Sequence, residues 1–341
     1  MKSLHAPALR SLCRQVPCVA GRERGLTLIE LLVALAISSI VAIAAVSALI
    51  VSRQGLITVD AASQLRENAR FATDLIQRLG VQTGYEDFIY ATTTRPANVF
   101  GIASNPDSAV TGFNNALPSY SDPYNTVTAR TAGTVGYGSD VLVLHYQASE
   151  TFPGSGVSDK TMINCAGNAS STIPSNRDDR MVSVLYVDIS QGEPSLMCST
   201  GPSTGQPIIQ GVENFQVLYG VDNVTPNTAP AAGAAADSVG DRFLRADQMT
   251  VTSDSIGTNA NWRRVRSLRI GMVIRGPVGS AQDTTAQTLY PLGQAKNSSG
   301  GSAGSAMSSS NDPGTIFSPA ADTRMRQAIT FTVHLRNEQG L

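Results

Sequence analysis

The stretch RGLTLIELLVAL, from Arg24 to Leu35, opens a long apolar run and places one carboxylate, Glu30, just inside it. The run continues to Val51, so that 26 residues from Leu26 onward contain neither Pro nor Gly and no charge besides Glu30. A helix needs about 20 mostly apolar residues to cross a bilayer. Residues 26–51 are therefore predicted to form a membrane-spanning helix.

The 25 residues before this run have a different composition. One acid, Glu23, is opposed by five basic side chains: Lys2, Arg10, Arg14, Arg22 and Arg24. Basic flanks of membrane helices tend to stay in the cytoplasm, so residues 1–25 are predicted to be cytoplasmic. The small residue that a peptidase could accept, Gly25, lies before the apolar run and not after it. Cleavage after Gly25 would remove residues 1–25 and keep the helix.

Glu30 needs a separate explanation, because an ionised carboxylate is costly in hydrocarbon. Cleavage after Gly25 would make Leu26 the new N-terminus and Glu30 the fifth residue of the new chain. In one interpretation, Glu30 interacts only with the positive end of its own helix. We favour a second interpretation, in which Glu30 pairs with the Leu26 amine of a neighbouring subunit. Such pairs would neutralise both charges and fix the stagger of helices packed side by side.

The segment RGLTLIELLVALAI resembles the class III leader junction of type IV prepilins and pseudopilins. The common pattern is Gly, then Phe or another apolar residue, then Thr-Leu-(Ile/Val)-Glu-Leu, and this chain has Leu26 where Phe is most frequent. The resemblance implies cleavage by prepilin peptidase between Gly25 and Leu26, and N-methylation of Leu26 by analogy. It also implies that Leu26 and Glu30 act in subunit assembly.

Removing residues 1–25 would leave 20 basic and 25 acidic side chains, a net charge of −5, which disfavours a general nucleic-acid binder. Cys13 and Cys18 would be lost with the leader. The remaining pair, Cys165 and Cys198, would reach an oxidising compartment and is predicted to form a disulfide. Their surroundings lack the CxxC spacing of a zinc site.

Apolar residues continue at helical spacing after Val51, so residues 52–84 are predicted to extend the helix as an amphipathic half that ends at Gly80 and Gly84. From Tyr85 onward, short apolar alternations separated by turn residues predict antiparallel strands. They are VLVLHYQ, MVSVLYVDI, FQVLYGV, VRSLRIGMVIR and ITFTVHLRN. Two segments rich in small residues, 225–240 and 296–314, are predicted to be flexible loops. The predicted fold is α+β, with one long helix packed on the β-rich head 85–341.

Several later stretches are similar to the PilW family of minor pilins. They are ENARFATDLIQRLGVQTGY at the helix exit, IIQGVENFQVLYGVD, ADQMT followed by NWRRVRSLRIGMVIR, and MRQAITFTVHLRN near the C-terminus. Residues 86–160 match no motif that we can name. The resemblance therefore covers both ends and the middle of the chain.

Residue patterns for catalysis are weak, and neither a metal nor a cofactor is expected. His145 and His334 each lie inside a strand pattern, and no phosphate-binding GxxxxGK[ST] motif occurs. Asp188–Glu193 offers oxygen ligands without the spacing of an EF-hand. The basic cluster Arg263, Arg264, Arg266 and Arg269 could contact DNA, but the acidic mature chain disfavours this.

The resemblance implies a minor pilin of a type IV pilus and not an enzyme. Such a protein joins other minor pilins at the inner-membrane assembly platform, initiates polymerisation of the major pilin and ends at the pilus tip. Its head is expected in the periplasm. One alternative is a J-type minor pseudopilin of a type II secretion system, and a second is a membrane-anchored exported enzyme.

Overall fold

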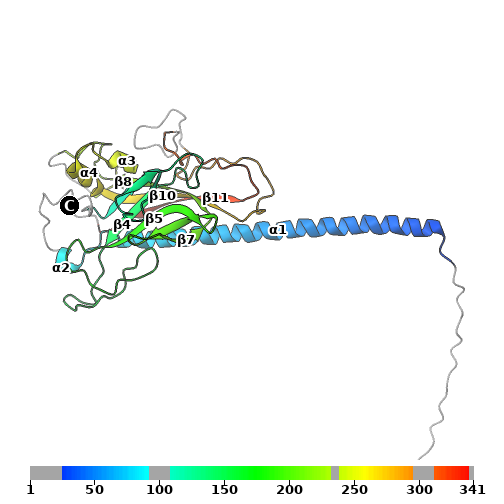
Figure 1. Ribbon diagram of the computed structural model, residues 1–341, viewed down its shortest axis with the longest axis horizontal. Helices are drawn as coiled ribbons and strands as arrows, with labels where there is room; N and C mark the ends of the chain where they lie inside the picture. Colours follow the sequence, from blue (N-terminus) through cyan, green and yellow to red (C-terminus); the bar gives the residue numbers. More distant parts are fainter. Residues whose placement is uncertain (1–24, 92–107, 232–237, 295–310, 338–341) are drawn as a thin grey trace, which may run out of the picture. The chain divides into compact units, whose positions relative to one another are not determined.

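A computed structural model describes residues 25–91, 108–231, 238–294 and 311–337 (Figure 1). The chain divides into two compact units, Met1–Arg53 and Gln54–Leu341. Helix α1, Leu28–Gln82, contributes to both units. Three further helices are short: α2 (Phe88–Ala91), α3 (Ala246–Met249) and α4 (Ser255–Trp262).

The first half of α1 is apolar and exposed throughout, from Leu28 to Val51. By length and composition, α1 could cross a membrane, and none of its most apolar window is buried. The second half buries a stripe at spacings of three and four residues, the period of one helix face. The stripe consists of Ala61, Leu65, Ala69, Ala72, Ile76 and Leu79. Leu56 is 63% exposed, and the buried residues of α1 begin at Ala61.

The predicted end of the helix needs one correction. We expected Gly80 to end it, but α1 passes through Gly80 and ends at Gln82. Gly80 is buried, and a Cβ at this position would collide with Val333. Its missing side chain therefore allows close packing and does not break the helix. Gly84 adopts a φ of +77°, the left-handed conformation that glycine supplies after a helix.

The head contains two larger antiparallel sheets and a two-stranded one. The first has the order β1-β4-β5-β6-β7, with strands Val110–Phe113, Val141–Tyr146, Met181–Ser190, Glu193–Ser199 and Gln206–Gln210. The second has the order β11-β10-β8-β9, with strands Arg326–His334, Val265–Arg275, Val212–Val221 and Arg242–Leu244. Strands β2 (Ala116–Pro118) and β3 (Val127–Ala129) form the small sheet.

All five predicted strands are present, as β4, β5, β8, β10 and β11, so the predicted α+β fold is confirmed. On β10, Leu268, Ile270, Met272 and Ile274 share one face of the strand and are fully buried. Together with residues of the first sheet, such as Leu144 and Leu185, they share one apolar core with the stripe of α1 from Leu65 to Leu79. In Figure 1 the strands gather over the C-terminal half of α1.

Asp140 joins the two larger sheets. Its backbone N–H donates to Phe215 O at 2.8 Å, and its carboxylate accepts the N–H of Val217 at 2.8 Å, both on β8. The same carboxylate accepts the N–H of Asn115 at 3.0 Å. These contacts lie just before β4 begins, so the carboxylate takes the place of a neighbouring strand beside β8. Burial raises the pKa of Asp140 well above its ordinary value.

A second buried carboxylate, Asp312, gives the head a pH-dependent stability. Burial raises the pKa of Asp312 from 3.8 to about 6, against the attraction of Arg245 at 3.8 Å. Below about pH 4, Asp312 is protonated in both the folded and the unfolded chain, so it does not lower the free energy of unfolding. Between about pH 4 and 6, Asp312 ionises in the unfolded chain but stays protonated in the folded one, so the free energy of unfolding falls as the pH rises. Above about pH 6, Asp312 is ionised in both states and the loss of stability is complete.

We therefore expect Asp312→Asn to stabilise the head near neutral pH, by about 1 to 3 kcal/mol at about 1.4 kcal/mol per pKa unit. The difference from wild type should vanish as the pH falls to about 4. Denaturant unfolding of the full-length wild type and the Asp312→Asn variant, in detergent and at several pH values, measures this difference in stability. A less stable Asn variant at about pH 7.5 would contradict this assignment.

Candidate site for processing and assembly

The peptide bond between Gly25 and Leu26 lies in a non-helical segment just before α1. Residues 25–27 are exposed, and Leu26 is 75% exposed. A Cβ added to Gly25 would meet nothing within 4 Å, and the fold therefore does not require glycine there. Within the described residues, local packing therefore gives no reason for glycine at this position.

Thr27 and Glu30 form a reciprocal cap at the start of α1. Thr27 N–H and Thr27 Oγ1 donate to Glu30 Oε2 at 3.0 and 2.9 Å, and Glu30 N–H donates to Thr27 Oγ1 at 3.4 Å. This is the capping box of the pattern T-x-x-E, which satisfies free N–H groups at a helix N-terminus. The spacing of this cap is visible in the opening stretch, where Thr27 stands three residues before Glu30, but we did not predict the cap from it.

The other polar side chains in residues 28–51 are internally satisfied. The hydroxyls of Ser38, Ser39 and Ser47 donate to backbone carbonyls three or four residues earlier, at 2.6 to 2.8 Å. Polar groups in hydrocarbon need such partners. The second oxygen of Glu30, Oε1, accepts no hydrogen bond from the described residues. Glu30 thus has a free acceptor at the start of an exposed apolar helix.

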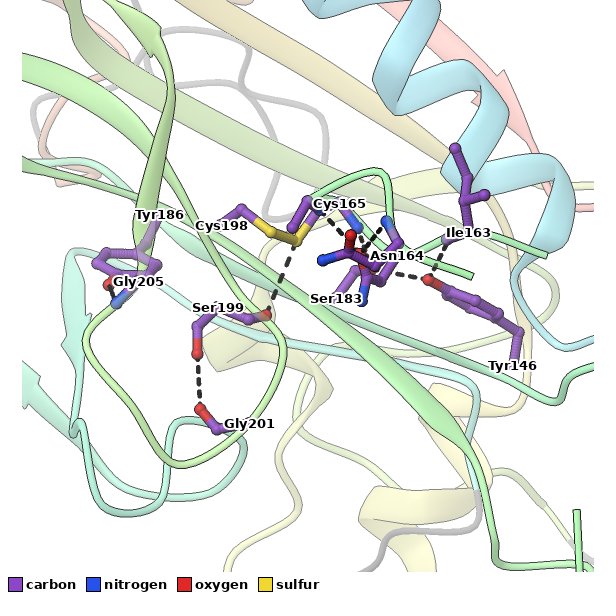
Figure 2. The surroundings of a disulfide bond; sticks show 12 residues. Tyr146, Ile163, Asn164, Cys165, Ser183, Tyr186, Cys198, Ser199, Gly201 and Gly205 are labelled. Atoms are coloured by element: carbon purple, nitrogen blue, oxygen red, sulfur yellow. Dashed lines mark hydrogen bonds between the residues drawn. A yellow bond between two sulfur atoms is a disulfide. The ribbon is translucent and has the colours of Figure 1, made fainter. Parts of the chain in front are cut away.

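The predicted disulfide between Cys165 and Cys198 is present, with both cysteines buried and their Cα atoms 5.7 Å apart. Figure 2 shows that Ser183 on β5 lies beside it: Ser183 Oγ accepts Cys165 N–H at 2.9 Å and contacts Tyr146 OH at 2.9 Å. Tyr146 OH also donates to Ile163 O. The bond therefore fastens the long segment between β4 and β5 to β6.

This segment is also tied to α1. Ile163 N–H donates to the side-chain oxygen of Gln82 at 2.8 Å, at the end of the helix. Gly84 N–H donates to His145 O, and Gln147 N–H donates to Tyr85 O, so the chain leaving the helix pairs with β4 and its extension. His145 is buried here, and burial lowers its pKa to about 3. The imidazole is therefore neutral at physiological pH.

Acid–base pairs connect the two larger sheets at the end of the head where α1 enters. Arg275 on β10 pairs with Glu193 on β6 at 2.7 Å and with Glu213 on β8 at 2.9 Å. Glu213 also pairs with Arg326 on β11 at 2.6 Å. The hydrogen bond from Arg275 lowers the pKa of Glu193. Sequence reasoning missed this network because its members are far apart along the chain.

The loose oxygen set Asp188–Glu193 is a β-hairpin turn. Gln191 and Gly192 both have positive φ and connect β5 directly to β6. Asp188 accepts the hydroxyl of Tyr120 at 2.9 Å, while Glu193 pairs with arginines. Across the described ranges, no group of three or more His, Cys, Asp or Glu side chains could hold a metal ion.

Two members of the basic cluster that we considered for DNA contact point inward. Arg266 is 4% exposed and lies 3.5 Å from the buried Asp222 carboxylate. Arg264 is buried and donates to Asp222 O at 3.3 Å. Arg269 donates to Leu292 O and lies over the ring of Phe243. These three guanidinium groups therefore have structural contacts within the head.

Comparisons with known proteins find similarity at both ends of the chain. Residues 184–337 match the family described as Type IV Pilus-assembly protein W, and residues 21–46 match the prokaryotic N-terminal methylation motif. Among solved structures, a type IV-like pilin from Thermus thermophilus matches at 12% identity with a TM-score of 0.37, over 81% of this chain and 98% of that chain. No curated relative matches. The two family matches confirm the resemblance predicted from the sequence.

Proposed function

We propose that this chain, with its prepilin-type N-terminus and PilW-type C-terminal region, is a minor pilin that initiates assembly of a type IV pilus. The observation that carries the proposal is the junction at the start of α1. There an exposed, non-helical Gly25–Leu26 bond directly precedes a capped, wholly exposed apolar helix with one acceptor left on Glu30. A simple membrane anchor requires neither the glycine nor the carboxylate.

The proposed path begins in the inner membrane. Residues 1–25 form the cytoplasmic leader, residues 26–51 span the membrane, residues 52–84 continue the helix, and residues 85–341 form the periplasmic head. Prepilin peptidase cleaves after Gly25, and Leu26 becomes the N-methylated first residue. The disulfide supports this topology, because such bonds persist in oxidising compartments such as the periplasm.

In the filament, the exposed apolar half of α1 packs against helices of other pilins. Glu30 Oε1 accepts a hydrogen bond from the Leu26 amine of a neighbour, which removes two unpaired charges from an apolar environment. The chain joins other minor pilins, primes the major pilin and occupies the pilus tip. The match to a pilus-assembly family favours this role over that of a J-type pseudopilin.

The experiment uses cells that lack the chain and are complemented with wild type, Gly25→Val or Gly21→Val. We expect wild type and Gly21→Val to begin at Leu26 and to restore pili, with type II secretion unaffected throughout. Gly25→Val should retain residues 1–25 and fail to restore pili, because a branched side chain stands at the scissile bond. N-terminal sequencing, intact mass, pilus counts and a secretion assay provide the measurements.

The outcomes separate the alternatives. Lost secretion with normal pili would identify a pseudopilin. A full-length, uncut wild-type protein would point to an anchored protein of another kind and overturn the proposal.

A further inference from the structure

Strand β11 is an edge strand along its whole length. One side pairs with β10 from Arg326 to His334 in an unbroken antiparallel register. In the described ranges of the chain, no strand pairs with the other side. This edge strand has nine residues, whereas β1, which forms one edge of the first sheet, has four.

The direction of each backbone group on β11 follows from the contacts at its two ends. Gly276 N–H donates to Met325 O at 2.8 Å, and Leu335 N–H donates to Arg266 O at 2.9 Å. In an antiparallel pair these directions alternate, so odd-numbered residues of β11 bond to β10. The N–H and C=O groups of the even-numbered residues therefore point away from the sheet. The residues are Arg326, Ala328, Thr330, Thr332 and His334.

The middle of this edge, from Gln327 to Val333, has none of the usual protection. In natural proteins, Pro, charged side chains or bulges on an edge strand prevent unwanted pairing with other strands. Residues 327–333, QAITFTV, contain neither Pro nor a charge, and their register has no bulge. The other edge of the first sheet, β7, contains Pro207. The edge of β11 thus has the composition of a strand that is paired on both sides.

The edge also has a defined direction relative to the second half of α1. At one end, Ser280 O accepts Thr58 Oγ1, and Ser280 Oγ accepts Met325 N–H. At the other end, Asn337 donates to the carbonyl oxygens of Val81 and Thr83. The strand therefore runs along α1 in the same direction as the helix. If the helix of a neighbouring subunit packs alongside α1, the strands in the head of that subunit also lie along the axis of α1.

We infer that the free edge of β11 accepts an extended strand from the head of a neighbouring pilin-type subunit, which enlarges the four-stranded sheet to five. The inference rests on the proposed assembly function. The row of N–H and C=O groups supplies the binding energy. Side chains of the incoming strand that face the core side would meet the partly buried Ile329 and Phe331. Those on the other side would lie beside Thr330 and Thr332.

The test compares Thr332→Pro with Thr332→Val in the full-length chain, expressed at equal levels in cells that make the pilus. Proline removes the outward N–H and blocks a neighbouring strand, while the bonds to β10 stay because the N–H of Thr332 does not face β10. Valine keeps the N–H. We expect about tenfold less co-purified pilin with proline and no change with valine, since a lost hydrogen bond plus exclusion of the strand has that order of effect.

Amide exchange read residue by residue gives a second measurement that does not depend on the variant folding. In the isolated protein, the amides of Thr330, Thr332 and His334 should exchange fast, while those of Ile329, Phe331 and Val333 exchange slowly. In the purified complex with partner pilins, all six should be slow. Even-numbered amides that stay fast in the complex, or normal complexes with Thr332→Pro, would overturn the inference while leaving the proposed function intact.

Two further outcomes would contradict either the identity of the incoming strand or the proposed function. Protection of the same amides in the isolated protein that increases with its concentration would identify a second copy as the occupant and overturn the assignment to a different pilin. Absence of any complex with wild type would instead contradict the proposed function.

Discussion

Replacing Glu30 with alanine should lower the association of this chain with partner pilins by about a hundredfold or more, while membrane insertion and cleavage after Gly25 continue. The loss leaves the Leu26 amine of a neighbour buried without its partner, and breaking one side of a buried ion pair has effects of this order. Insertion should not suffer, because the change removes a charge from the apolar run. Co-purification of partner pilins and pilus counts at equal expression measure the effect.

The capping box provides a matched control. Glutamine can replace glutamate in a capping box, so Glu30→Gln should keep the cap to Thr27 and lose only the charge. We expect the Gln variant to assemble as poorly as the Ala variant. If Gln assembles normally and Ala does not, the cap is the essential function of Glu30. Normal assembly of both would reduce Glu30 to an ordinary helix-end residue.

Removing the disulfide should destabilise the head by about 3 to 4 kcal/mol in the chain-entropy model for a separation of 33 residues. This is a large fraction of the roughly 5 to 15 kcal/mol that stabilises a typical folded protein. The double variant Cys165→Ala, Cys198→Ala should therefore unfold at lower denaturant concentration in detergent. Reductant should produce the same shift in wild type.

Reductant added to the double variant is the control and should change nothing. In native wild type without reductant, a maleimide should label neither cysteine of the mature chain. Labelling of both thiols in the oxidised protein would contradict the bond, and an unchanged unfolding midpoint would contradict its contribution to stability.

The sequence predicted the long helix and strands β4, β5, β8, β10 and β11, because their apolar patterns extend over six or more residues. It did not predict β1, β7 or the seven-residue β6, EPSLMCS, in which Glu, Pro and Ser interrupt the apolar residues. The apolar run from Leu26 to Val51 is 26 residues long, and in β10 apolar residues occupy every second position from Leu268 to Ile274. Strands β2, β3 and β9 have three residues each, too few for an alternation to be visible. The role of Gly80 was misjudged because sequence cannot distinguish a helix-ending glycine from one required for close packing.

For the candidate site, the local pattern was visible and the distant contacts were not. Gly25, Leu26 and Glu30 were found from a dense motif, and the Cys165–Cys198 pair followed from the loss of the other two cysteines. The link that Asp140 makes between the two larger sheets depends on Phe215 and Val217, about 75 positions away. No single sequence reveals such a pairing, because an aspartate before a strand is common in ordinary turns.

The contact between α1 and β11 sets an order of events in time. In the proposed topology α1 emerges from the membrane first, yet Asn337 reaches the carbonyl oxygen of Val81 across 256 residues of chain. Val333 packs against Gly80 from a similar distance along the chain. Contacts between such remote segments form late and slowly during folding. In that topology we expect part of the apolar face of α1 to stay uncovered until β11 has crossed the membrane, so the head cannot close before this strand arrives.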